Sequence, residues 1–86
     1  MTAHIDRSIR QGLVGLLRPT EGQAVEQIRA ILAEFAAIVV DVKDFSSSQN
    51  GKVWTCAVVQ ASTDVIGAFT GRLGRVPDVR VKSFVL

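Results

Sequence analysis

The sequence predicts an α+β domain in which one four-stranded antiparallel sheet carries two helices on a single face. Two observations support this fold class. Strand-like and helix-like segments follow one another in the order strand, helix, strand, strand, helix, strand. Residues typical of turns stand between the segments. At 86 residues, the chain is expected to form one domain over 1–86 with a modest core, which makes self-association a plausible source of further stability.

The first half of the chain predicts a strand and a helix. Residues 1–7 lack a usable period, and we expect a flexible leader there. Ser8–Arg18 alternates loosely and ends at Pro19, which favours an extended residue before it. Across 19–35, apolar residues recur at helical spacing. These residues are Ala24, Ile28, Ile31, Leu32 and Phe35.

The second half begins with two strands joined by a turn. Ala37–Phe45 is rich in β-branched residues, and Lys52–Gln60 also contains several of them, so both segments favour strands. Between them, Ser46–Gly51 contains the Asn-Gly pair typical of hairpins. A second helix is expected from Asp64 to about Leu73, and a final strand over 79–86. The resulting βαββαβ order is that of the ferredoxin-like split βαβ fold.

The sequence indicates where the second helix starts and ends, and this helix has an unusual glycine pattern. Ser62 or Thr63 is expected to cap its start, and Gly74 to follow its end. Gly67, Gly71 and Gly74 have neither Rossmann nor P-loop spacing, so a phosphate cradle is excluded. We expect Gly67 and Gly71 to permit close packing against the sheet or another helix.

The segment containing these glycines carries a family resemblance. Residues 64–83, DVIGAFTGRLGRVPDVRVKS, closely resemble the ending of the proteins called putative iron-only hydrogenase system regulators. Upstream, the resemblance is one of layout from about Ser8. Asp78 stands where the family often has Gly, which concerns the turn before the last strand. The resemblance implies an ACT-like, ferredoxin-like fold and a regulatory or ligand-sensing module without an established activity.

Composition and single residues weigh against several kinds of chemistry. Cys56 is the only cysteine and His4 the only histidine, and neither has metal-ligand spacing or a catalytic partner. We therefore expect no catalytic residue, metal or cofactor. No signal peptide or membrane span is apparent, so we expect a cytoplasmic protein without a membrane role.

Nucleic-acid binding is the alternative function. The formal net charge is only +2, and the RNA-recognition signature is absent from the third strand. A local basic run is nevertheless present, and we expect its residues to be solvated rather than to bind nucleic acid. The run consists of Arg72, Arg75, Arg80 and Lys82.

Self-association is expected because the third strand is apolar on both sides. One side carries Trp54, Cys56 and Val58, and the other carries Val53, Ala57 and Val59. Since helices cover a single face, a second copy is expected to cover the other, or to pair with the edge of the second strand. The partner is therefore the chain itself, as a homodimer or higher oligomer.

A ligand, either a small effector or a partner protein, is expected at the turn before the first helix. Unpaired N–H groups at a helix start favour an anion, and Arg18 stands beside them. Thr20 is the expected cap, with Gln23 completing a capping box, and Gly22 permits close approach. The resemblance adds that ACT domains commonly bind effectors at the matching turn. The candidate ligand-binding residues are Arg18, Thr20, Glu21, Gly22 and Gln23.

Overall fold

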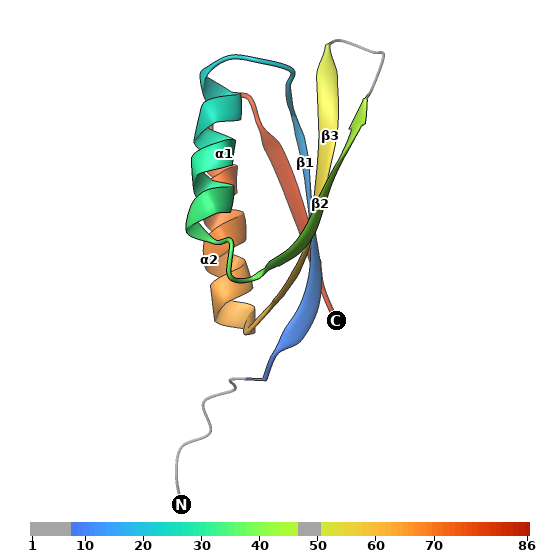
Figure 1. The fold of residues 1–86 in the computed structure, drawn as a ribbon, viewed down its shortest axis with the longest axis vertical. Coiled ribbons are helices and arrows are strands. Elements are labelled where there is room, and N and C mark those ends of the chain that lie inside the picture. Colours follow the sequence, from blue (N-terminus) through green and yellow to red (C-terminus); the bar gives the residue numbers. More distant parts are fainter. Residues whose placement is uncertain (1–7, 47–50) are drawn as a thin grey trace, which may run out of the picture.

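A computed structural model describes residues 8–46 and 51–86 of the protein. Its elements are β1 (Arg10–Pro19), α1 (Gln23–Glu34), β2 (Val39–Ser46), β3 (Lys52–Ala61), α2 (Thr63–Gly74) and β4 (Arg80–Val85). The strands form one sheet in the order β2-β3-β1-β4, and all neighbours are antiparallel. Figure 1 shows both helices on the same side of this sheet. The predicted fold class is therefore confirmed.

The strand register separates the sheet into a covered face and an open face. Val14 of β1 lies beside Ala57 of β3 and is fully buried, whereas its neighbour Leu13 lies beside Val58 and is 45% exposed. Since successive side chains of a strand point to opposite faces, this alternation distinguishes the helix-covered face from the open one. The predicted division of the third strand into two apolar sides is confirmed.

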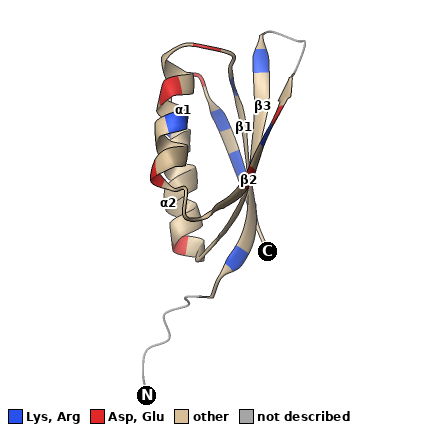
Figure 2. Cartoon of the chain, viewed as in Figure 1, with Lys and Arg blue, Asp and Glu red and all other residues tan. Residues whose placement is uncertain are grey.

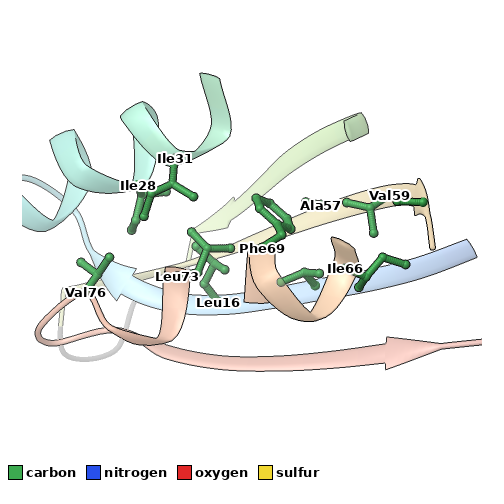
Figure 3. Packing of buried hydrophobic residues seen from close by; sticks show 11 residues of the cluster. Leu16, Ile28, Ile31, Ala57, Val59, Ile66, Phe69, Leu73 and Val76 are labelled. Atoms are coloured by element: carbon green, nitrogen blue, oxygen red, sulfur yellow. The ribbon is translucent and has the colours of Figure 1, made fainter. Parts of the chain in front are cut away.

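The core lies between the helices and the covered face of the sheet. Figure 3 shows side chains of α1 and α2 projecting toward the strands. The ring centroids of Phe35 and Phe69 lie 5.1 Å apart, so the two helices also meet through an aromatic pair. The buried core residues are Val14, Leu16, Ile28, Ile31, Ala57, Val59, Ala61, Ile66, Phe69, Leu73 and Val76. The helical period of the sequence therefore correctly predicted which side of α1 faces the sheet.

The start of α2 agrees with the sequence, but its end does not. Ser62 is the N-cap, and its hydroxyl accepts the Val65 N–H at 3.3 Å. The helix extends through Gly74, and Arg75 is the C-cap in right-handed helical geometry. The prediction that Gly74 follows the helix end is wrong, because the chain makes no left-handed turn there.

The glycines of α2 do not provide close packing within the chain. A Cβ added at Gly67 or Gly71 would meet no atom within 4 Å, so the prediction of close approach to the sheet or to α1 is wrong. The tight glycine is instead Gly12 of β1. A Cβ there would lie 3.2 Å from a Val59 methyl and 3.3 Å from the carbonyl oxygen of Phe84. The Cδ1 atom of Ile66 on α2 would be 3.4 Å away, so Gly12 allows β3, β4 and α2 to pack closely around β1.

Parts of two predictions fall on residues that the structure does not describe. The expected leader, 1–7, lies outside the described residues, as do residues 47–50 of the expected hairpin turn. Gly51, at the end of that turn, has a positive φ of 63°. Among the described helices, none is long and apolar enough to cross a membrane.

Candidate functional site

Arg18, Thr55 and Asp44 form a polar cluster on the helix-covered face of the sheet. Arg18 Nε donates to Thr55 Oγ1 at 2.8 Å, and Arg18 Nη2 lies 3.1 Å from Asp44 Oδ2. Thr55 Oγ1 donates in turn to Asp44 Oδ1 at 2.7 Å. Arg18 Nη1 donates to the carbonyl oxygen of Pro19 at 2.8 Å. Each nitrogen of the guanidinium therefore has a partner, which satisfies a charged group under a helix.

The three members of the cluster differ in their exposure. Thr55 is 3% exposed, and the Arg18 side chain is 12% exposed. The Asp44 side chain is 55% exposed because β2 is an edge strand. The cation is thus fixed inside the protein, and the anion lies at its rim.

A cavity of about 130 Å³ adjoins this cluster, between α1 and the sheet. Its lining combines four apolar side chains with two arginines, a carboxylate and a hydroxyl. The lining residues are Arg18, Val25, Ile28, Arg29, Leu32, Val42, Asp44 and Thr55. Apolar walls with a few fixed polar groups are typical of small-molecule sites.

Of the five predicted ligand residues, only Arg18 lines this cavity. Thr20, Glu21 and Gly22 are exposed on the turn between β1 and α1, and Gln23 is exposed as the first residue of α1. Arg18 therefore lies beneath the helix, whereas the other four candidate residues lie at its N-terminal end. That a ligand contacts Arg18 together with residues 20–23 stays a prediction.

The N-terminus of α1 differs from the prediction. The N-cap is Gly22, with φ 106° and ψ −167°, and no side chain caps the helix. The prediction that Thr20 and Gln23 form a capping box is wrong, because the chain turns through Gly22 two residues after Thr20. The Gly22 carbonyl oxygen accepts from Val25 N at 3.1 Å. This backbone region is occupied almost only by glycine, so Gly22 has a structural role of its own.

Asp44 and Thr55 were missed as site residues, although the sequence contained a signal. Both occupy strand positions whose neighbours in phase are apolar: Thr55 stands between Val53 and Ala57, and Asp44 follows Val42. Polar residues in the buried phase of a strand require partners. Arg18 stands in the same phase as Val14 and Leu16. Recognising that it meets Asp44 and Thr55, however, requires the strand register.

The open face of the sheet has an apolar centre on its two middle strands. Leu13 and Leu17 of β1 lie beside Val58 and Trp54 of β3, respectively, and Trp54 is 49% exposed. Phe45 of β2 lies across from Trp54 and is 52% exposed. The open face is therefore a contiguous apolar surface of the kind that marks interaction sites.

Charged residues surround this apolar centre. Lys43 lies on β2, Arg80 and Lys82 on β4, and Lys52 at the start of β3. None of these four forms an ion pair with another described residue. Of the carboxylates, Asp41 lies on the same face, and Asp78 lines a hollow with Lys52 and Arg80. Figure 2 shows both signs of charge along α1 and basic positions along the strands. The open face therefore carries an excess of positive charge at its edges.

The predicted basic run is divided by the fold. Arg72 lies on α2 and its Nη1 is 2.7 Å from Glu34 Oε2 of α1. Arg75 caps the helix end. Only Arg80 and Lys82 reach the open face, beside Leu17 and Gly15 of β1. The run is therefore not one continuous surface.

Metal binding finds no support in the part of the chain that is described. Residues 8–46 and 51–86 contain no group of three or more His, Cys, Asp or Glu that could hold a metal ion. Cys56 is a free thiol of intermediate exposure on the open face. His4 lies outside the described residues.

The strand order and the one-sided helices define a ferredoxin-like domain of the ACT type. An ACT domain protein from Streptococcus pneumoniae is similar, with a TM-score of 0.59 at 13% identity over 88% of this chain and 89% of that one. The regulatory subunit of aspartate kinase from Thermus flavus has a TM-score of 0.58 at 13% identity over 92% of this chain and 57% of that one. These likenesses establish the ACT-like fold.

Within this class, the chain belongs to the TM1266-like family, described as "Iron-only hydrogenase system regulator, putative", whose model matches residues 10–83. The uncharacterized protein TM1266 from Thermotoga maritima has a TM-score of 0.85 at 23% identity, over 92% of this chain and 99% of that one. Among curated proteins, no sequence matches the chain. The resemblance found in residues 64–83 is therefore confirmed.

Proposed function

We propose that the protein is a ligand-sensing regulatory module that acts as a homo-oligomer and not as an enzyme. The family description and the fold shared with the regulatory subunit of aspartate kinase support this class of function. One observation carries the proposal: the largely buried guanidinium of Arg18 lines a cavity that also has four apolar lining residues.

The ligand is proposed to bind between this cavity and the turn over residues 18–23. Arg18 supplies a positive charge that is weakly solvated and therefore effective. The start of α1 lacks a side-chain cap, and backbone N–H groups at a helix start favour negative charge. A small metabolite with an anionic group suits both features.

A thermal-shift screen against amino acids, nucleotides and metals tests this proposal. A genuine ligand is expected to raise the Tm of the parent and of Arg75→Gln, a control in which an exposed arginine is removed. Arg18→Gln should lose most of the affinity in calorimetric titration below its own Tm. A ligand that binds Arg18→Gln as tightly as the parent would place the site elsewhere.

Self-association is proposed to occur through the open face, with a second copy as the occupant. The apolar centre on β1 and β3 and the charged edges match the core and rim of protein interfaces. Pairing through the edge of β2 is less suitable. This strand has a register irregularity between Val39 and Asp41, and the Asp41 carboxylate already accepts the Val42 N–H at 2.9 Å.

Light scattering coupled to size-exclusion chromatography tests the assembly. Leu13→Glu places a charge in the centre of the open face and should yield monomers at micromolar concentration. Val65→Glu is the matched control, because Val65 is 38% exposed on α2, compared with 45% for Leu13. A monomeric parent, or a Leu13→Glu variant that remains oligomeric, would contradict this interface.

A nucleic-acid-binding accessory role is the second candidate, favoured by the cations at the edges of the open face. A hollow of about 360 Å³ adjoins two of them and is lined by Leu17, Lys52, Asp78, Val79 and Arg80. Trp54 and Phe45 could stack on bases of a single strand. Binding to a generic oligonucleotide that falls steeply with salt would support this role. Absence of such binding at low salt would exclude it.

A further inference from the structure

The ion pair between Arg18 and Asp44 is asymmetric in how firmly each partner is held. Arg18 is 12% exposed and also donates to Thr55 Oγ1 and to the Pro19 carbonyl oxygen, so its position does not depend on Asp44. The Asp44 side chain is 55% exposed on an edge strand. Moving the carboxylate of Asp44 into water breaks one further hydrogen bond, from Thr55 Oγ1, whereas moving the guanidinium would break two, to Thr55 Oγ1 and to the Pro19 carbonyl oxygen.

Asp44 also neutralises the charge that an anionic ligand would need. Arg18 and Arg29 are the cations of the cavity lining, and Asp44 is the anion. An incoming carboxylate must compete with Asp44 for Arg18, since both suit the same planar guanidinium.

The cavity restricts the rest of such a ligand. Its volume is about 130 Å³, and a cavity of roughly 150 Å³ holds a molecule of about six carbon atoms. Its apolar lining, Val25, Ile28 and Leu32 of α1 and Val42 of β2, offers surface with which a hydrocarbon chain can pack. The fitting chemistry is a carboxylate on a short aliphatic chain.

We propose that Asp44 is a built-in competitor for Arg18, and that a short-chain aliphatic carboxylate displaces it when it enters the cavity. This inference rests on the proposed function and names the ligand class and the regulation of the same site. The ligand carboxylate takes the place of Asp44 as acceptor from the guanidinium and from Thr55 Oγ1, the aliphatic chain packs under α1, and Asp44 turns to solvent.

Displacement of Asp44 has a consequence on the other side of the sheet. Its neighbours in β2, Lys43 and Phe45, face the open side, across from Cys56 and Trp54. Releasing Asp44 removes a side-chain tether of β2 to the middle of the sheet. Ligand binding is therefore coupled to the positions of Lys43 and Phe45 on the open face, and such coupling is reciprocal.

Calorimetric titration with butyrate, and with butyramide as an uncharged probe of similar shape, tests the inference. Asp44→Asn removes the competing charge and should bind butyrate at least about tenfold more tightly than the parent. Asp41→Asn is the matched control, because Asp41 lies on the same strand but faces the open side. Its affinity should equal that of the parent, and butyramide should bind none of the three.

Amide hydrogen exchange provides a second measurement that does not depend on a variant. Butyrate should accelerate exchange in β2 of the parent while leaving β1 protected. If Asp44→Asn binds butyrate no more tightly than the parent, or if exchange in β2 is unchanged at saturation, Asp44 is not a competitor, and the proposed sensing function is unaffected. If butyrate binds no variant while another ligand depends on Arg18, the ligand class is wrong and the site stands. Failure of every ligand in the screen would instead overturn the proposed function.

Discussion

Glu34 of α1 and Arg72 of α2 join the two helices on their solvent side, with Oε2 and Nη1 2.7 Å apart. The hydrogen bond from Arg72 lowers the pKa of the Glu34 carboxyl below its ordinary value of 4.5, and Glu34 raises the pKa of Arg72. Arg72 also lies 6.0 Å above the ring of Phe35, so one side chain connects the surface pair to the aromatic contact beneath it.

The lowered pKa predicts a pH dependence of stability. The pair stabilises the folded state at pH values above 4.5, and this contribution is lost as the pH falls below 4.5 through the lowered pKa. Glu34→Gln should therefore lower the Tm near neutral pH and converge with the parent in acid. Thermal unfolding across this range is the measurement. Glu26→Gln is the control, because Glu26 lies 4.0 Å from Arg29 with both side chains mostly exposed. An undiminished gap between Glu34→Gln and the parent in acid would contradict the assignment.

Two glycine substitutions should have opposite effects on stability. Gly67→Ala adds a methyl group with no neighbour within 4 Å in an exposed helix and should stabilise the fold by up to about 1 kcal/mol. Gly12→Ala forces a methyl group against Val59 and the Phe84 carbonyl oxygen and should destabilise it by about 1–3 kcal/mol. Denaturant titration of monomeric protein measures both. Destabilisation of the monomer by Gly67→Ala would contradict the open space around Gly67.

Gly22→Ala is expected to destabilise the fold even in the absence of ligand. With φ at 106° and ψ at −167°, any side chain at this position is strained, at a cost of about 1–3 kcal/mol. Glu21→Ala, one residue earlier, should leave stability nearly unchanged. Equal denaturation midpoints for the two variants would contradict the strain. Loss of ligand binding in a Gly22 variant is therefore interpretable only after its stability has been measured.

The helices, the strands and the sides that they turn to the core could be predicted from the sequence. The period of hydrophobic residues and the residue types of turns depend only on neighbours in the sequence. The positions of Ile28, Ile31 and Leu32 identified the covered side of α1, and Asn-Gly separated β2 from β3. Asp44 was not predicted as a partner of Arg18, because the two are 26 residues apart and meet only through the register of three strands. The prediction of the N-cap of α1 was wrong for a different reason. Thr20 has the chemistry of a cap, but backbone geometry at Gly22 determined where the helix begins.

Trp54 is the only tryptophan of the chain, which contains no tyrosine, and it stands half exposed on the open face. The natural fluorescence of the protein therefore originates almost entirely from a residue outside the core. Unfolding should change its emission only modestly, since the indole is already partly in water. Anything that covers the sheet should shift the emission to shorter wavelength and shield the indole from soluble quenchers. The molecule thus carries an intrinsic optical reporter of its own contacts, and a poor one of its folding.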